Sequence, residues 1–600
     1  MGDALELGPA LSLQGTSLPY NYLPAAFPDW ASLPEIPSRV LIVLPDPDSD
    51  VARATARYHL VNSGTQNNPA SLSAFVRDLA GDDLAASDRC LFGPPSRAGL
   101  ANTAPALTLN LDPLEPGNGL APARIAVIID IGIAFWNARF RRVGGPGFKG
   151  MWFLDFDAPL DGKATLTRLG EEDIEALCKL ADAPGGAEQV VATLGQTFPG
   201  SWYGPGGGAG PDAFWHGTAM ADLMAGLPQD APDGTALYGI ELPMAVLRDA
   251  DGDSLSAVLP LMVEAALAMT RGQSQVPLTI VLPWGFAAGP QDGSHPAAQA
   301  IARVLANARG SAGPAQGGRD VTLIVPAGNQ LQDRCCGRLT GGPVGGPDQH
   351  LCWQLPPDDF SQNAVEISVR PLGPASEVQT LRIVPPGGPT LVVTIREREV
   401  VPILSGGVLV GLLVRFGDSG GGARLRLVLA PTGWGGPHAV PAPPGDWGLG
   451  VAATDSVRAW ILRDDRDRAL DGPLPRRMSR FADIRYHDSD ATGGAPLGDD
   501  PGSPVVRSGT MSLLATAAGV MAVQANEADL GGAARQAAYS GRRSDGSLPS
   551  EVALVDQGRT GRGVLAAANG GDRRMRVSGT SAAAALRART ALGLPALPPD

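Results

Sequence analysis

Short apolar runs that alternate with helical patterns dominate the sequence from residue 124 onward. The runs are apolar throughout, as in strands that are covered on both faces of a sheet. They lie at residues 124–130, 244–247, 278–282 and 321–325, and helical patterns separate them at 257–270 and 296–309. Because strands and helices that alternate at this spacing build parallel sheets, the chain is predicted to be an α/β protein with helices on both faces of the sheet.

Three of the predicted strands lead into residues that are able to carry chemistry or bind a ligand. Asp130 ends the first run, Trp284 follows the third, and Asn329 follows the fourth. Ligands of open α/β sheets bind at the carboxyl ends of the strands. The sequence therefore predicts one functional rim that includes these three residues.

Between about residues 352 and 465 the pattern changes to strands alone. Seven short strand patterns are bounded by Gly, Pro or Asp, and they lie at 364–369, 378–384, 391–395, 408–416, 425–429, 449–453 and 458–462. Such a series without helices predicts a β-sandwich. Helical patterns return at 510–523 and 581–592. The sandwich is therefore predicted to be an insertion within the α/β domain.

The first 120 residues are predicted to form a separate N-terminal extension. Residues 1–38 have no sustained period and are expected to lie as an extended arm over a neighbouring surface. A strand pattern at 39–45 and helical patterns at 51–61 and 71–84 predict a small α/β region, for which a regulatory role is one alternative. The predicted domain order is thus 1–120, 121–345 with an insertion at about 142–210, the sandwich at 352–465, and 466–600.

Composition and charge exclude several classes of function. The chain has 47 Lys and Arg against 61 Asp and Glu, and the net charge of −14 argues against nucleic-acid and anionic-membrane partners. It has neither an apolar run of membrane-spanning length nor a secretory signal pattern, so a cytoplasmic location is expected. Its five cysteines form no C-x-x-C pair and no paired-histidine motif is present, so neither a metal nor a cofactor is predicted.

Four short motifs contain residues suited to nucleophilic catalysis. Asp130 lies in I-D-I-G-I, His216 in H-G-T-A-M-A, Asn329 in V-P-A-G-N, and Ser581 in S-G-T-S-A-A-A. Each motif alone has a plain structural alternative, since an Asp can cap the next element, a His can belong to the core, and an Asn after Gly is usually a turn. G-T-S also occurs at residues 15–17. Only the combination and the order of the motifs point to catalysis.

In that order the four motifs resemble those of the subtilisin-like serine proteases, the subtilases. The resemblance covers about 121–345 and 500–600 and implies a subtilisin-like parallel sheet. It also implies that Ser581 is the nucleophile, that His216 is its general base, and that Asp130 orients the imidazole. Asn329 would donate a hydrogen bond to the oxyanion.

The resemblance further implies where a substrate would bind. An extended peptide would pair with Pro283, Trp284 and Gly285, while Gly252 and Asp253 would line a second strand, and Ala327 and Gly328 would floor the first specificity pocket. The chain departs from the family pattern at Pro283, which lacks the N–H of the usual residue, and in the Ala-rich run after Ser581, which lacks the usual proline.

The sequence thus predicts a serine endopeptidase that cleaves protein or peptide substrates through an acyl-enzyme intermediate. Two alternatives stay open. The chain could be a catalytically inactive binding or scaffold protein on the same fold, with the β-sandwich recognising a protein partner. It could instead be a conditionally active protease in which residues 1–120 or 142–210 block the cleft.

Overall fold

The computed structural model describes most of residues 122–597 and six short segments before them. The early segments are 5–8, 10–12, 39–44, 57–62, 89–93 and 106–108. Within 122–597 the description leaves out 144, 156–164, 206, 211–212, 228–233, 245–252, 286–288, 311–317, 341–348, 360–362, 371–377, 398, 417–421, 434–439, 452–454, 463–476, 529–532 and 557–561.

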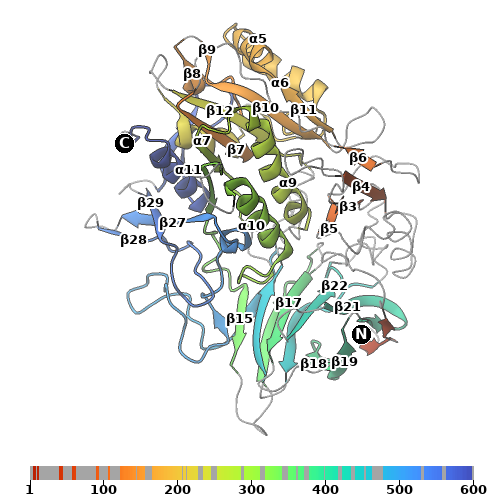
Figure 1. Cartoon of the computed structure of the whole chain (residues 1–600). Coiled ribbons are helices and arrows are strands. Elements are labelled where there is room, and N and C mark those ends of the chain that lie inside the picture. Colours follow the sequence, from red (N-terminus) through yellow and green to blue (C-terminus); the bar gives the residue numbers. More distant parts are fainter. Residues whose placement is uncertain are drawn as a thin grey trace.

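A mixed nine-stranded sheet forms the centre of the α/β part, and its middle strands are parallel (Figure 1). The parallel strands lie in the order β12 (Thr235–Glu241), β7 (Arg124–Asp130), β13 (Leu278–Val281), β14 (Val321–Pro326) and β27 (Met521–Ala528). Parallel β10 (Phe148–Asp155) and antiparallel β11 (Thr165–Leu169) extend one side, and antiparallel β28 (Ala534–Gln536) and parallel β29 (Glu551–Asp556) pair with β27.

Helices cover both faces of this sheet, as the sequence predicts. Along β7, Ile125, Val127 and Ile129 face one hydrophobic core, and Ala126 and Ile128 face another. The first core contains α9 (Asp253–Met269) and α10 (Pro296–Arg309), and the second contains α7 (His216–Ala225) and α11 (Thr580–Ala591). In the part of the chain that the structure describes, no helix has the length and apolar character needed to span a bilayer.

The region between β7 and α7 widens one edge of the sheet. It contributes the hairpin β8 (Arg141–Arg142) and β9 (Gly145–Pro146), the strands β10 and β11, and the helices α5 (Glu171–Ala181) and α6 (Gly186–Thr197). The rings of Phe153 and Phe198 stack with centroids 4.1 Å apart, which fastens the chain after α6 to β10. Much of the predicted insertion at 142–210 is therefore regular structure built onto the sheet.

Two antiparallel sheets share a third core, apart from the two cores on the faces of the central sheet. One is ordered β1 (Leu5–Leu7), β20 (Glu399–Ser405), β21 (Val408–Phe416), β22 (Ala423–Leu429), β17 (Asn363–Arg370), β24 (Ser456–Ile461), β15 (Cys336–Leu339) and β26 (Val505–Val506), with β2 (Leu11–Ser12) also on β20. The other is ordered β19 (Leu391–Arg396), β18 (Val378–Val384), β23 (Gly445–Val451), β16 (Gln349–Leu355) and β25 (Arg480–Ala482). Strands from outside 352–465 thus join both sheets, including two from the N-terminus.

The larger antiparallel sheet is covered on both of its faces. On β21, Leu413 belongs to the core between the two antiparallel sheets, whereas Leu412 and Val414 belong to the core that contains α9 and α10. Across the same boundary, Arg424 Nη2 donates to Ser294 Oγ just before α10, at 2.9 Å. The sheet is therefore a layer between the α/β part and the smaller antiparallel sheet, which explains why its strands are nearly continuous apolar runs.

Two predicted elements are wrong, and two others are not tested by the described residues. The helix predicted at 510–523 is a short 3-10 turn, η5 (Leu513–Thr516), followed by β27, because pairing with β14 overrides the helical propensity of its Ala and Leu residues. The helix predicted at 51–61 overlaps the strand β4 (Arg57–Asn62), and the one predicted at 71–84 lies outside the described residues. Of the strand predicted at 244–247, residues 245–247 also lie outside the description, and the described strand before them is β12.

The early segments contain a four-stranded antiparallel sheet with the order β5 (Arg89–Gly93), β3 (Arg39–Leu44), β4 (Arg57–Asn62) and β6 (Ala106–Thr108). Its β5 edge lies against α9.

The other short elements are η1 (Ala138–Phe140), η2 (Arg271–Gln273) and a hairpin of β30 (Val564–Ala567) and β31 (Arg574–Val577). Strand β30 of this hairpin packs on α7.

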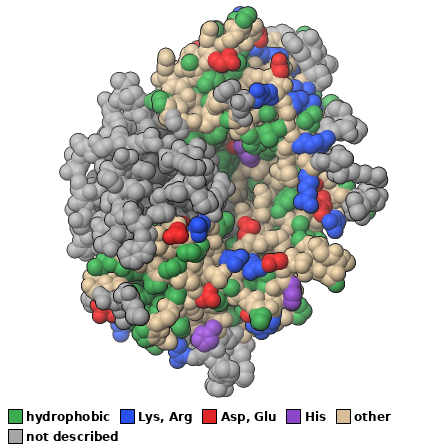
Figure 2. All heavy atoms as spheres, turned by 180° about the vertical axis from the view of Figure 1, so that it is seen from behind, with side chains coloured by type: hydrophobic (Ala, Val, Ile, Leu, Met, Phe, Trp, Pro, Cys, Tyr) green, Lys and Arg blue, Asp and Glu red, His purple; other side chains and the backbone are tan. Residues whose placement is uncertain are grey.

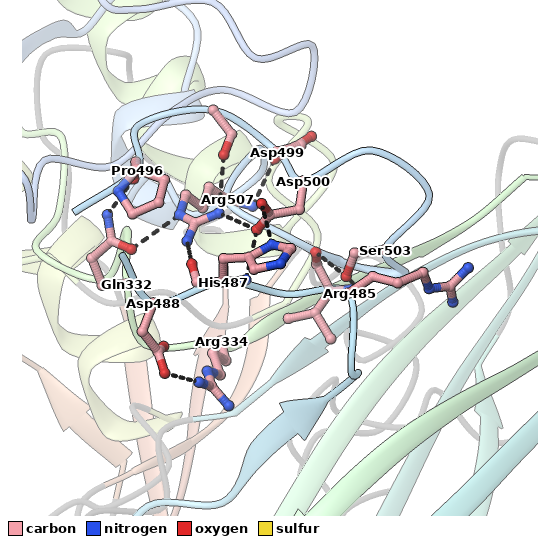
Figure 3. Close-up of polar contacts among 12 residues, drawn as sticks. Gln332, Arg334, Arg485, His487, Asp488, Pro496, Asp499, Asp500, Ser503 and Arg507 are labelled. Carbon is pink, nitrogen blue, oxygen red and sulfur yellow. Dashed lines mark hydrogen bonds and ion pairs between the residues drawn. The ribbon is translucent and has the colours of Figure 1, made fainter. Parts of the chain in front are cut away.

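A buried arginine fastens the irregular segment 483–503 to the rest of the chain (Figure 3). Arg507 is fully buried, donates to Asp500 Oδ2 at 2.9 Å and to Gln332 Oε1 at 3.0 Å, and also donates to the carbonyl of His487. Its guanidinium lies 4.2 Å from the centre of the Tyr486 ring. One cation thus holds a segment that has little secondary structure of its own.

Replacing this cation should loosen the segment. Arg507→Met removes the buried partner of Asp500, and we expect a loss of about 3 kcal/mol in the free energy of unfolding together with new protease cleavage within 483–503. The matched control is Arg485→Met, because Arg485 pairs with Asp483 at the surface, and its loss should cost under about 1 kcal/mol. Equal effects of the two substitutions on denaturant unfolding would contradict this assignment.

Candidate active site

Asp130 and His216 form the polar pair at the centre of the predicted rim. Asp130 is the last residue of β7 and is fully buried, and His216 is the first residue of α7. Nδ1 of His216 lies 2.9 Å from Oδ1 and 2.8 Å from Oδ2 of Asp130. The His216 side chain is 35% exposed, whereas that of Asp130 is fully buried.

The two residues after His216 dock α7 on the turn that follows β7. The Gly217 N–H donates to the Ile131 carbonyl at 2.8 Å, and a Cβ on Gly217 would lie 2.8 Å from that same oxygen. Thr218 donates through its N–H and its hydroxyl to the Gly132 carbonyl, at 2.9 and 2.6 Å. A side chain at Gly217 would push the helix away, and Thr218 holds the helix to the turn through its two hydrogen bonds.

Two more N–H groups bind the Asp130 carboxylate. The N–H of Ile131 and the indole Nε1–H of Trp284 both donate to Oδ1, each at 2.8 Å. The Trp284 ring also lies 5.9 Å from the His216 ring, centroid to centroid. The buried carboxylate is therefore satisfied by three separate segments of the chain.

Ser581 lies in the first turn of α11, which begins directly after Gly579. Gly579 has a φ of 110°, which is in the region that favours glycine, and it lets the chain enter the helix at this angle. The Ser581 hydroxyl donates to the Pro283 carbonyl at 2.7 Å. Within the described residues it makes no hydrogen bond with His216. Residues 582–585 are all alanine and all buried, which allows α11 to pack closely on α7 and the sheet.

Asn329 lies beside the same helix start. Its Oδ1 accepts hydrogen bonds from the N–H and the hydroxyl of Thr580, both at 2.9 Å. Since Oδ1 is occupied, Nδ2 is the group left to donate, and no described residue accepts from it. The Ser581 N–H belongs to the first turn of α11, where backbone N–H groups have no partner within the helix. Two donors are therefore available next to the Ser581 hydroxyl.

A tyrosine and an aspartate hold the turn before Ser581 from the other side. The N–H of Gly579 donates to Tyr539 Oη at 3.1 Å, and Tyr539 in turn donates to Asp556 Oδ2 at 2.9 Å. Ser578 Oγ donates to Asp556 Oδ1 at 2.8 Å. Partial burial raises the pKa of Tyr539, so it stays a neutral donor under ordinary conditions.

Glu241 is a buried carboxyl group one strand away from Asp130. It ends β12 and pairs in register with Asp130 on β7. Its two oxygens accept from the N–H groups of Gly132 and Ile133, at 2.7 and 3.1 Å. Burial raises its pKa to about 8 and the Asp130 charge adds to the increase, although the hydrogen bonds from the two amides and from Tyr203 lower it. This group therefore titrates near neutral pH while it holds the turn after Asp130.

Two opposing effects act on the pKa of His216. Burial lowers its pKa, whereas the charge of Asp130 and the hydrogen bond to it raise the pKa, and the net result lies above the ordinary value of 6.5. An imidazole that is stabilised in its protonated form is suited to accept a proton from a neighbouring hydroxyl group.

The structure brings most of the predicted site residues together. Contacts join Asp130 to His216 and Trp284, Pro283 to Ser581, and Asn329 to the residue before Ser581. The predicted substrate-binding residues Pro283, Trp284, Gly285, Ala327 and Gly328 adjoin them: a Cβ on Gly285 would lie 3.4 Å from Pro326, directly before Ala327 and Gly328. Gly252 lies outside the described residues, and Asp253 is described only as the start of α9.

Sequence reasoning missed several residues of the site. Glu241 ends an apolar strand as Asp130 does, and that signal could have marked it. Tyr539 and Asp556 carry no local signal, because only the fold brings them to α11.

A space-filling view of one face shows a hollow that contains a histidine side chain, with acidic and hydrophobic side chains nearby (Figure 2).

No known family model and no curated protein matches the sequence. Among solved structures, the chain is similar to the CspB protease of Clostridium perfringens. The two have 14% sequence identity and a TM-score of 0.52, over 79% of this chain and 83% of that protease. The chain therefore shares a mixed α/β fold with a protease. This likeness of fold does not assign the chemistry of the site, which depends on the residues that this chain carries.

The position of Glu241 predicts how stability depends on pH. Its pKa is higher in the folded chain, about 8, than the ordinary 4.5, so its contribution to stability is complete below about pH 4.5 and is lost as the pH rises through 8. We expect the melting temperature to fall between about pH 5.5 and pH 9, and to fall less in Glu241→Gln. Exposed Glu172→Gln is the control and should leave the slope unchanged. A slope in Glu241→Gln equal to that of the parent chain would refute this origin.

Proposed function

We propose that this chain is a serine endopeptidase of the subtilase type. The observation that carries the proposal is a series of contacts among five distant segments, in which Asp130 binds His216 and Trp284, the neighbouring Pro283 accepts from Ser581, and Asn329 accepts from Thr580. The similarity of fold to a clostridial protease supports a peptidase in general. The four motifs favour the subtilase type in particular.

In the proposed reaction, Ser581 Oγ attacks the carbonyl carbon of the scissile bond. His216 takes the hydroxyl proton and gives it to the leaving amine, and Asp130 keeps the imidazole in the tautomer with Nδ1–H. The oxyanion receives hydrogen bonds from Asn329 Nδ2 and the Ser581 N–H. Water then hydrolyses the acyl-enzyme through the same base, which restores Ser581.

An extended substrate strand is proposed to pair with residues 283–285. Pro283 has no N–H, so this pairing would use its carbonyl oxygen and the N–H of Gly285. The Pro283 carbonyl accepts from Ser581 in the structure. A substrate N–H that takes over this carbonyl would free the Ser581 hydroxyl for His216, so binding and activation of the nucleophile would be coupled.

Covalent labelling tests the proposed nucleophile. A fluorophosphonate probe should label the purified chain at Ser581, and Ser581→Ala should abolish labelling, because phosphonylation requires an activated hydroxyl group. Ser489→Ala, at an exposed position in the segment 483–503, is the matched control and should label normally. Labelling that persists in Ser581→Ala would eliminate Ser581 as the nucleophile.

The two ends of the Asn329 side chain are predicted to have separate roles. Asn329→Asp keeps an oxygen for Thr580 but replaces the Nδ2 donor, so folding should be preserved while kcat on a peptide substrate falls by about a hundredfold to a thousandfold. Asn329→Ala removes both groups and should additionally lower the melting temperature. A wild-type kcat in Asn329→Asp would show that Nδ2 does not stabilise the oxyanion.

The second candidate function is a catalytically inactive binding or scaffold protein that recognises a partner through its antiparallel sheets. The observation that favours it is the Ser581 hydroxyl, which bonds to the Pro283 carbonyl instead of His216. Catalytic hydrogen bonds often tighten only when substrate binds, so this geometry is compatible with both candidates. Complete failure of fluorophosphonate labelling in the folded chain would favour the scaffold.

Conditional activity is a variant of the first proposal. The four-stranded sheet of the early segments lies against α9, which begins at Asp253, beside the segment that the subtilase resemblance assigns to substrate binding. This placement supports a regulatory role for the first 120 residues. An intact chain that labels only after limited proteolysis would favour this variant, and equal labelling before and after proteolysis would refute it.

A further inference from the structure

The segment Pro283–Trp284 touches every member of the proposed catalytic triad. The Pro283 carbonyl accepts from Ser581 at 2.7 Å, the Trp284 indole N–H donates to Asp130 at 2.8 Å, and the indole ring lies 5.9 Å from the His216 ring, centroid to centroid. The subtilase resemblance implies only a wall of the substrate cleft for Trp284. The hydrogen bond from its indole N–H to Asp130 is a further contact, beyond forming a wall of the cleft.

We propose that Trp284 is a positioning residue, whose indole N–H fixes the Asp130 carboxylate in the orientation that His216 requires. The inference rests on the proposed function for its catalytic consequence, but the contact itself does not depend on it. Because Trp284 belongs to the segment proposed to bind substrate, the same residue connects the substrate strand to the triad.

The distribution of donors around Asp130 explains why the indole matters. Oδ1 accepts from both Ile131 and Trp284, whereas the shorter of the two His216 contacts is to Oδ2. Two donors on one oxygen hold the plane of the carboxylate, so that its two oxygens face the imidazole at 2.9 and 2.8 Å. Without the indole, only the Ile131 N–H would hold the carboxylate in this plane against the imidazole. An indole N–H also does not titrate, so it donates at every working pH.

Other tryptophans in the same part of the fold show that such a contact is not a general result of burial. Four indole N–H groups are buried without any hydrogen-bond partner among the described residues, those of Trp136, Trp152, Trp202 and Trp215. These rings pack in the cores around the sheet. The Trp284 indole, which is only partly buried, instead points its N–H at the fully buried carboxylate of Asp130.

The first test measures the contact without any reference to activity. In a chain labelled with 15N-tryptophan, the indole signal of Trp284 is assigned by its loss in Trp284→Phe, and that of Trp152 by its loss in Trp152→Phe. Asp130→Asn, which removes the charge on the acceptor, should shift the Trp284 signal and leave the Trp152 signal in place. A Trp284 signal that ignores Asp130→Asn would overturn the proposal.

The second test measures the consequence for the nucleophile. A small fluorophosphonate does not fill the substrate cleft, so its maximal labelling rate reports activation of Ser581 and not the shape of a cleft wall. Trp284→Phe keeps an aromatic ring but loses the N–H, and it should lower this rate about tenfold, since a hydrogen bond to a charged group contributes more than 1.4 kcal/mol. Trp152→Phe, which loses an indole without a partner, should stay within about twofold of the parent.

The two tests separate the possible failures. A labelling rate in Trp284→Phe equal to that of the parent, in a chain that melts at the parent's temperature, would overturn the positioning role. If Trp284→Phe does not fold, the Trp284 signal is assigned by elimination, from the signals lost when the other tryptophans are replaced one at a time by Phe, and its response to Asp130→Asn still decides. If the parent chain does not label at all, the proposed function fails, and the same signals still decide whether Trp284 holds Asp130.

Discussion

The buried carboxylate of Asp130 is the constraint on which the rest of the candidate site depends. A charged group that is removed from water is tolerated only with nearly complete hydrogen bonding. Ile131, His216 and Trp284 supply that bonding from three segments of the chain. Each donor fixes a part of the site, because the N–H groups can reach one carboxylate only if the turn after β7, the start of α7 and the segment after β13 converge.

The packing of two helices then brings the nucleophile to the same place. Gly217 allows α7 to approach the turn after β7, and the buried alanines at 582–585 allow α11 to lie against α7 and the sheet. Both helices start at the carboxyl rim, so His216 and Ser581 occupy positions where backbone N–H groups have no helical partners. The antiparallel sheets pack behind α9 and α10, on the face of the central sheet opposite α7 and α11.

Local patterns predicted those elements in which propensity and tertiary environment agree. The limits of β7, α10, β18 and β21 coincide with the predicted ones, because the local pattern and the partners of each element favour the same structure. Prediction failed at 510–523, where alanine and leucine favour a helix but pairing with β14 imposes β27. Several antiparallel strands outside 352–465 were not predicted, because their partners lie far along the chain.

The sequence by itself determined which chemical groups are present and at which strand or helix ends they lie: Asp130, His216, Asn329 and Ser581 each follow from a short motif. Only the tertiary structure decided which atoms bond. Trp284 donates to Asp130 across 154 residues, Glu241 binds the turn after Asp130 across 109, and Ser581 donates to Pro283 across 298. Periodicity and propensity describe a residue and its near neighbours, whereas these contacts depend on strand register and on helix approach, which are set when the cores pack.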